Sequence, residues 1–308
     1  MIRIDDYCNA DLDQLADEHF KLLNPTETTT RLINGVTTAT TKFKTHALVS
    51  RIIRAKKKSQ AKGDLKQVTF WDYFLNNQHV KLVEVITGRP SALKAIVTHL
   101  DVTFGQKFLA TRVDYHESSL NTFGKMVAGV FNYDTLYRRK DACVDAVKSL
   151  NIHYCPNCNL YPVEIIEYPI AGTGFQKKQA LLELDHFYPQ SRFPYLALSF
   201  FNLIPGCSIC NARLKLEKDF DVDTHFNPYE KRLHDHFRFK IDKLNPAGHS
   251  DFNIQISSAT AHSPLAIDDF RILERYNQNH KSLLYDTIAF MRHRRKGIFN
   301  SVLRQLPN

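Results

Sequence analysis

The chain has 308 residues, and its 41 lysines and arginines exceed its 32 acidic residues, which gives a formal net charge of +9. Hydrophobic residues make up 43% of the sequence and charged residues 24%, which is typical of a folded globular protein. This composition excludes a disordered tail protein, a collagen-like fibre and a coiled coil. No run of 18 apolar residues is present and the N-terminus has no apolar signal core, so we expect no membrane span and a cytoplasmic location.

The first 150 residues predict a mostly helical domain that binds a partner or DNA. Apolar residues recur at helical spacing in residues 8–24, and Pro25 ends that pattern. The threonine-rich stretch 27–42, which contains Asn34-Gly35, predicts a loop. Further helices are expected over 45–60, over 67–86, from Ser91 and over 119–150.

The character of the chain changes after residue 150. Residues 151–230 are rich in cysteine, proline and asparagine, with short strand-like runs at 163–166 and 181–184. Residues 231–308 predict a hairpin of two strands, 238–241 and 251–256, followed by C-terminal helices from Ile267. We therefore expect three domains, which are residues 1–150, 151–230 and 231–308.

The net charge differs between these segments, being +6 in the first, −3 in the second and +6 in the third. Carboxylates attract cations and basic flanks hold phosphates, so this pattern suits a metal-dependent enzyme that acts on nucleic acid. The alternative is a basic protein with scattered charge. Two basic clusters are candidates for phosphate contacts, with a solvated helix face as the alternative for each. The clusters are Arg51, Arg54, Lys56, Lys57 and Lys58, and Arg292, Arg294, Arg295 and Lys296.

Cysteines form two C-x-x-C pairs, Cys155 with Cys158 and Cys207 with Cys210, separated by 48 residues. One such turn can place two thiolates on a tetrahedral ion, and two turns complete a four-sulfur site with no open position. We therefore expect a structural zinc ion at these cysteines. A redox dithiol is disfavoured because no βαβ pattern surrounds either pair, and an iron–sulfur cluster is a minor alternative.

Polar residues with a specific order lie between and beside these pairs. Asp185-His186 is followed 16 positions later by Asn202, and then by Asn211 and Lys215. Together with the cysteine pairs, this order resembles the HNH endonucleases, the ββα-metal nuclease superfamily, over residues 153–229. Asn211 stands where the third motif residue is histidine or asparagine, so the chain resembles an H-N-N variant. The Asp-His motif is also similar to the HNH domain of the RNA-guided CRISPR nucleases.

The resemblance implies an α+β fold, with a zinc-stapled ββα-metal core flanked by the helical N-terminal domain and by the hairpin and C-terminal helices. It implies hydrolysis of DNA phosphodiester bonds, with His186 as the general base that takes a proton from water. Asp185 and Asn211 offer the hard oxygen donors that Mg²⁺ or Mn²⁺ prefers. Asn202 is then expected to bond the backbone of the loop that carries His186, and Lys215 to contact a phosphate.

Other interpretations stay open. One is a zinc-stabilised nucleic-acid-binding module without catalysis, and another is an RNase or toxin of the same fold. The chain also resembles the nuclease subunits of bacterial anti-phage systems of the Septu and retron-associated type, which implies a regulatory ATPase partner. Glu183 is either a group that supports the metal ligands or an exposed side chain. We expect His225, His234 and His236 to pack or to contact DNA rather than to bind a metal.

Overall fold

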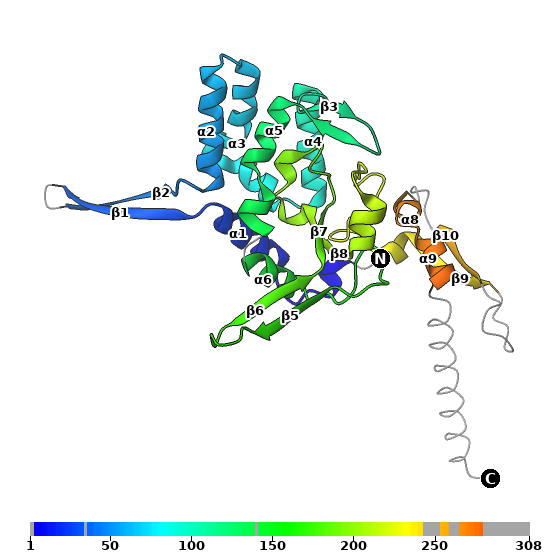
Figure 1. The fold of residues 1–308 in the computed structure, drawn as a ribbon. Coiled ribbons are helices and arrows are strands. Elements are labelled where there is room, and N and C mark those ends of the chain that lie inside the picture. The colour runs from blue at the N-terminus through cyan, green and yellow to red at the C-terminus, as the bar shows by residue number, and fades with distance from the viewer. Residues whose placement is uncertain (1–2, 34–35, 139–140, 243–252, 259–264, 280–308) are drawn as a thin grey trace, which may run out of the picture. The chain divides into compact units, whose positions relative to one another are not determined.

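The computed structural model describes residues 3–33, 36–138, 141–242, 253–258 and 265–279. Helices are combined with small two-stranded antiparallel sheets, which confirms the expected α+β class (Figure 1). The chain divides into two compact units, Met1–Arg232 and Leu233–Asn308. The domain boundary expected at residue 150 stays a prediction. Within the described ranges, no helix is both long and apolar enough to cross a membrane.

The helices of the first unit are α1 (Leu12–Leu23), α2 (Leu48–Ala61), α3 (Leu65–Thr87), α4 (Pro90–Phe104), α5 (Thr122–Val130) and α6 (Asp141–Ser149). Three of them begin where the side chain of Asp11, Asp64 or Asn121 accepts hydrogen bonds from amides of the first turn. Helix α4 begins with Pro90. The first N–H groups of a helix have no acceptor within the helix, so a proline at this position loses no hydrogen bond. Helix α3 is interrupted at 76–79, where the backbone is not helical.

The loop predicted for the threonine-rich stretch is wrong, because this stretch forms a hairpin. Strands β1 (Thr26–Ile33) and β2 (Val36–Phe43) pair without a register shift from Thr26 with Phe43 to Ile33 with Val36. Threonine is β-branched and favours strands, and an Asn-Gly pair between two such runs is a strong hairpin signal. In Figure 1 this hairpin extends away from the helices of the first unit.

Three further strand pairs belong to the first unit. Strands β3 (Ala110–Val113) and β4 (Ser118–Leu120) were not expected from the sequence. Strand β5 (Glu164–Pro169) pairs with β6 (Gln176–Leu181), and β7 (Glu183–His186) pairs with β8 (Leu203–Gly206). The single strand predicted for 181–184 is therefore wrong, because Leu182 separates two strands that have different partners. Short 3₁₀ or π turns are η1 (Ile4–Asp6), η2 (Asp134–Arg138), η3 (Pro194–Leu196), η4 (Phe200–Asn202) and η5 (Ile209–Lys215).

The second unit contains the expected hairpin and helices. Its elements are α7 (Leu233–His236), β9 (Phe237–Asp242), β10 (Asn253–Ser258), α8 (Leu265–Asp269) and α9 (Ile272–Asn279). Strands β9 and β10 are antiparallel. The basic residues Arg292, Arg294, Arg295 and Lys296 lie outside the described residues, so their role as phosphate contacts stays a prediction.

An aromatic core joins the helices of the first unit to the segment between β7 and β8. Trp71 is fully buried, and its indole N–H donates to Ser59 Oγ at 3.1 Å. The rings of Phe70 and Phe74 in α3 lie 6.3 and 6.4 Å from the ring of Tyr195 in η3. Because such rings bury large areas, the β7–β8 connection is packed on the helices rather than free in solvent.

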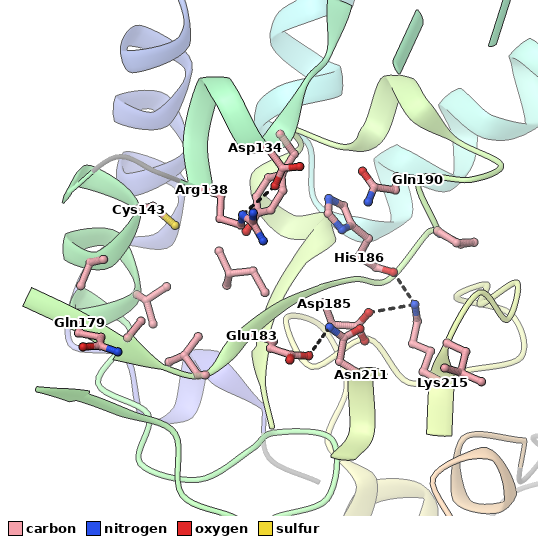
Figure 2. Close-up of a pocket in the computed structure, with 18 of the residues that line it drawn as sticks. Asp134, Arg138, Cys143, Gln179, Glu183, Asp185, His186, Gln190, Asn211 and Lys215 are labelled. Atoms are coloured by element: carbon pink, nitrogen blue, oxygen red, sulfur yellow. Dashed lines mark hydrogen bonds and ion pairs between the residues drawn. The ribbon is translucent and has the colours of Figure 1, made fainter. Parts of the chain in front are cut away.

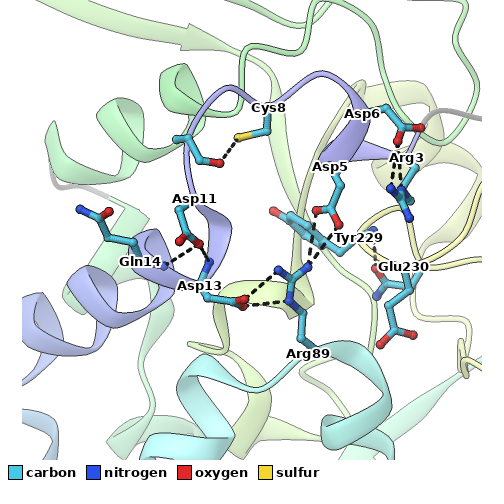
Figure 3. A network of polar contacts seen from close by, with 12 residues as sticks. Arg3, Asp5, Asp6, Cys8, Asp11, Asp13, Gln14, Arg89, Tyr229 and Glu230 are labelled. Atoms are coloured by element: carbon cyan, nitrogen blue, oxygen red, sulfur yellow. Dashed lines mark hydrogen bonds and ion pairs between the residues drawn. The ribbon is translucent and has the colours of Figure 1, made fainter.

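A polar network joins the start of the chain to the end of the first unit (Figure 3). Arg89, at the start of α4, binds Asp13 at 2.9 Å and Asp5 at 3.4 Å. The Ile4 amide donates to the Pro228 carbonyl at 2.8 Å. These ion pairs are partly exposed and each contributes little to stability, so their main effect is to fix the path of both segments.

Two glycines of α5 test the packing of this helix. A Cβ atom at Gly124 would lie 2.0 Å from the backbone oxygen of Leu109, whereas one at Gly129 meets no heavy atom within 4 Å. We expect Gly124→Ala to lower the free energy of unfolding by about 1–3 kcal/mol through overpacking. Gly129→Ala should raise it by about 0.5–1 kcal/mol, because alanine favours the helix. Chemical denaturation of both variants checks this, and a neutral Gly124→Ala would contradict the close contact.

Candidate functional site

Four cysteines from distant parts of the sequence form one buried cluster. The sulfur atoms of Cys155, Cys158, Cys207 and Cys210 all lie within 4.8 Å of one another. Those of Cys158 and Cys207 are 3.9 Å apart. A tetrahedral zinc site with Zn–S bonds of about 2.3 Å has sulfur atoms about 3.8 Å apart. The donor set and its spacing therefore fit a cluster that could hold a metal ion such as zinc.

Backbone hydrogen bonds shape both cysteine turns. The amides of Cys158 and Asn159 donate to the Cys155 carbonyl at 3.2 and 2.7 Å, and Asn159 takes a left-handed φ of +53° that turns the chain back. In the second turn, the Cys210 amide points at Cys207 Sγ from 3.5 Å. Hydrogen bonds from neighbouring thiols, first that of Cys155, hold the pKa of Cys158 well below its ordinary value. The same contacts raise the pKa of Cys155 and of Cys210, so the four thiols titrate as one coupled group. Thiolates are the metal-binding form of cysteine.

Asn202 closes the loop between β7 and β8. It is fully buried, its Oδ1 accepts from the Tyr188 amide at 2.7 Å, and its Nδ2 donates to the carbonyls of Tyr188 and Leu196 at 3.2 and 3.0 Å. These three bonds satisfy the side-chain amide and hold the backbone that follows His186. The supporting role expected for Asn202 matches this geometry, which makes it a positioning residue.

His186 ends strand β7, and its ring has a fixed orientation. Its Nε2 lies 3.1 Å from the Ala197 carbonyl oxygen, and the ring of Tyr133 meets it edge-on at 4.9 Å. A carbonyl can only accept, so Nε2 carries the proton and Nδ1 carries the lone pair. Burial lowers the pKa of His186 to about 4, which keeps the ring neutral at pH 7.

Lys215 lies at the end of η5 and is buried. Its Nζ donates to the His186 carbonyl at 2.6 Å and forms an ion pair with Asp185 Oδ1 at 3.0 Å (Figure 2). Only 1% of the residue is exposed, and a buried ammonium group needs such acceptors. In this structure Lys215 therefore joins η5 to the end of β7. The phosphate contact expected of Lys215 stays a prediction.

Asn211 and Glu183 form a further side-chain contact between η5 and β7. Asn211 Nδ2 donates to Glu183 Oε2 at 2.8 Å, which leaves the amide oxygen of Asn211 for other partners. Asn211 and Asp185 line the same hollow (Figure 2). Asn211 and Lys215 both lie on η5, which covers Ile209–Lys215. The structure also brings Glu183, left open by the sequence, into the site.

A hollow of about 690 Å³ in the first unit is lined by Glu183, Asp185, His186, Asn211 and Lys215 (Figure 2). Its wall carries carboxylates and basic groups, which are Asp134, Glu183, Asp185, Glu217, Arg138, Lys178 and Lys215. Asp134 and Arg138 come from η2 and form an ion pair at 2.7 Å. Sequence reasoning missed both, because no motif in the first 150 residues pointed to them. Acidic oxygens and cations in one hollow suit a ligand that combines a metal ion with an anion.

The basic cluster of α2 is largely used inside the protein. Arg51 donates to carbonyls at the end of α5, Arg54 donates to a carbonyl before α2, and Lys56 forms an ion pair with an aspartate of α3. Lys57 and Lys58 are exposed. The expected phosphate contacts of this cluster thus fit Lys57 and Lys58 better than the other three residues.

His225, one of the later histidines, packs as expected. Its ring stacks on Phe220 at 3.8 Å, and its Nε2 lies 3.2 Å from the Tyr115 hydroxyl. Within the described residues, the four cysteines are the one group of three or more histidine, cysteine or acidic side chains placed to share a metal ion.

Comparison with protein-family models, with curated proteins and with solved structures finds no match to this chain.

Proposed function

We propose that the hollow is the active site of a metal-dependent endonuclease of the HNH type, which hydrolyses phosphodiester bonds of DNA. The observation that carries this proposal is that His186 and oxygen donors from two elements line one hollow. His186 and Asp185 end strand β7, and Asn211 lies on η5 directly after the paired strand β8. The order strand, strand and short helical element from β7 to η5 supports this proposal.

The chemistry needs a base for water and charge neutralisation at the phosphate. The neutral ring of His186 offers Nδ1 as that base, while its Nε2 stays bound to the Ala197 carbonyl. Asp185 and Asn211 would hold Mg²⁺ or Mn²⁺, and such a cation supplies charge neutralisation at the phosphoryl and departing oxygens. Lys215 and Glu183 orient these two side chains through the contacts at 3.0 and 2.8 Å.

The four thiolates are proposed to hold a structural zinc ion. They leave no open coordination position, so this ion would not take part in hydrolysis. Its effect would be to fix the end of β8 and the start of η5, since Cys207 follows β8 and Cys210 lies in η5.

The proposed biological role is bacterial anti-phage defence in the cytoplasm, with a regulatory ATPase as partner. This role depends on the sequence resemblance alone. Purification of the chain from its native host, followed by plasmid cleavage with and without the co-purified proteins, tests it. Parallel assays on DNA and RNA distinguish a DNase from an RNase or toxin of the same fold.

Replacement of His186 by glutamine tests the base. The amide of the new side chain can still bond the Ala197 carbonyl but cannot take a proton, so we expect plasmid cleavage in Mg²⁺ to fall about 100- to 10,000-fold. His19→Gln is the matched control. His19 is also buried, its Nε2 lies 2.8 Å from the Leu198 carbonyl and its pKa is also about 4, but it does not line the hollow. Equal loss in both variants, or none in His186→Gln, would refute the assignment.

Metal removal separates the two proposed ions. Brief treatment with EDTA should stop cleavage, and added Mg²⁺ or Mn²⁺ should restore it, because hard oxygen donors release these ions readily. One zinc ion per chain should remain bound to the thiolates throughout, as measured by metal analysis. Cleavage that survives complete chelation would contradict the role of Asp185 and Asn211 as metal ligands.

A further inference from the structure

The β1–β2 hairpin, called the arm below, is exposed on both faces over the residues whose side chains the structure describes, apart from Phe43 at its base. Every residue of 26–30 and 37–42 is exposed, so the side chains of both faces of the ribbon meet solvent. Eight of the 18 residues in 26–43 are threonine. Across the ribbon, the hydroxyls of Thr28 and Thr41 lie 2.9 Å apart. The base is closed by a hydrogen bond from the Lys44 amide to the Pro25 carbonyl at 2.8 Å.

An isolated two-stranded hairpin is only marginally stable in water, so a partner that binds the arm would also order it. The cores of protein interfaces are apolar and rich in aromatic residues. In 26–30 and 37–42, Ala39 is the single apolar residue. Hairpin β5–β6 differs, because it exposes Ile166, Ile170 and Phe175. Residues 26–30 and 37–42 of the arm therefore offer polar rather than apolar contacts, and its larger apolar residues are confined to Leu32, Ile33 and Val36 beside the turn and Phe43 at the base.

The side chains of the arm are suited to contact the phosphate groups of nucleic acid. Residues 26–44 contain Arg31, Lys42 and Lys44 against one acidic residue, Glu27. Threonine hydroxyls and basic side chains are common donors to the phosphate oxygens of DNA. Single-stranded nucleic acid is bound largely by stacking on aromatic rings, and none is present in 26–30 or 37–42. These features favour a duplex over a single strand.

The dimensions of the arm agree with this choice. The major groove of B-DNA is about 12 Å wide and admits a two-stranded ribbon, whereas that of A-form RNA is deep and narrow. Eight residue pairs join β1 to β2, so the paired ribbon is about 24 Å long. We propose that the arm lies in the major groove of double-stranded DNA and holds the duplex for the hollow. This inference rests on the proposed action on DNA.

Shortening the arm tests the proposal in the full chain. Deletion of 29–32 and 37–40 removes four residues from each strand, which keeps the turn and preserves the side of the ribbon that each remaining residue faces. The probe is a fluorescent 30-base-pair DNA duplex, with binding measured by anisotropy in EDTA so that cleavage does not interfere. We expect the Kd to rise at least tenfold, with a shallower dependence of log K on log salt. Duplex RNA of the same sequence should bind more weakly than DNA to the intact chain.

A point substitution avoids any loss of the hairpin itself. Lys42→Ala should weaken duplex binding and reduce the salt slope by about one, because it removes one phosphate contact. Lys125→Ala is the matched control, since Lys125 is an exposed lysine on α5 outside the arm. It should leave both the affinity and the slope unchanged.

The proposal fails if the shortened chain binds the duplex with unchanged affinity and salt slope. It also fails if the intact chain forms a concentration-dependent dimer that arm deletion abolishes, because the arm then pairs with a second copy. If cleavage depends on His186 but duplex binding does not depend on the arm, the arm proposal is wrong and the proposed nuclease function stands. If duplex binding depends on the arm but no cleavage is observed, the arm proposal stands and the proposed nuclease function is wrong.

Discussion

The buried ammonium group of Lys215 joins the two elements that carry the candidate site. It binds the Asp185 carboxylate at 3.0 Å and the His186 carbonyl at 2.6 Å, and both ionic side chains are almost completely buried. Removal of one partner of a buried ion pair typically costs about 3–5 kcal/mol, because the other charge is left uncompensated. The end of β7 and the end of η5 therefore cannot separate without a large loss of stability. This link fixes Asp185, the His186 backbone and the end of η5 relative to one another.

The other end of η5 is held by a different interaction. Cys210 lies there in the four-cysteine cluster, and Asn211 follows it directly. Asn211 is thus placed between a sulfur cluster and a buried ion pair, and its amide is oriented by Glu183. On the strand side, Asn202 fixes the backbone beyond His186, and the Ala197 carbonyl fixes the tautomer of the ring. These contacts hold the side chains of Asn211 and His186 in fixed orientations, and the proposed hydrolysis would need such preorganisation.

Much of this site could be predicted from the sequence, because spacing restricts what a cysteine pair or an Asp-His pair can do. The spacing of the two C-x-x-C pairs predicted the proximity of the four cysteines, whereas the backbone bonds of Asn202 were expected from the family resemblance. The partners of Lys215 could not be predicted, because they depend on the burial of its side chain. Asp134 and Arg138 reach the hollow from η2 through tertiary packing alone. The β1–β2 arm was not predicted, because a polar stretch around Asn-Gly is typical of a loop, although β-branched threonines on both sides of that pair favour a hairpin.

The pH dependence of cleavage tests the central claim most directly. The pKa of His186 is lowered from 6.5 to about 4, so its neutral, base-competent form persists as the pH falls below 6.5. A histidine with an ordinary pKa of about 6.5 is roughly 90% protonated at pH 5.5 and would lose most of its activity there. We expect the cleavage rate of the folded protein in saturating Mg²⁺ at pH 5.5 to stay close to that at pH 7. A decline centred near pH 6.5, or an acid limb unchanged in His186→Gln, would contradict the account.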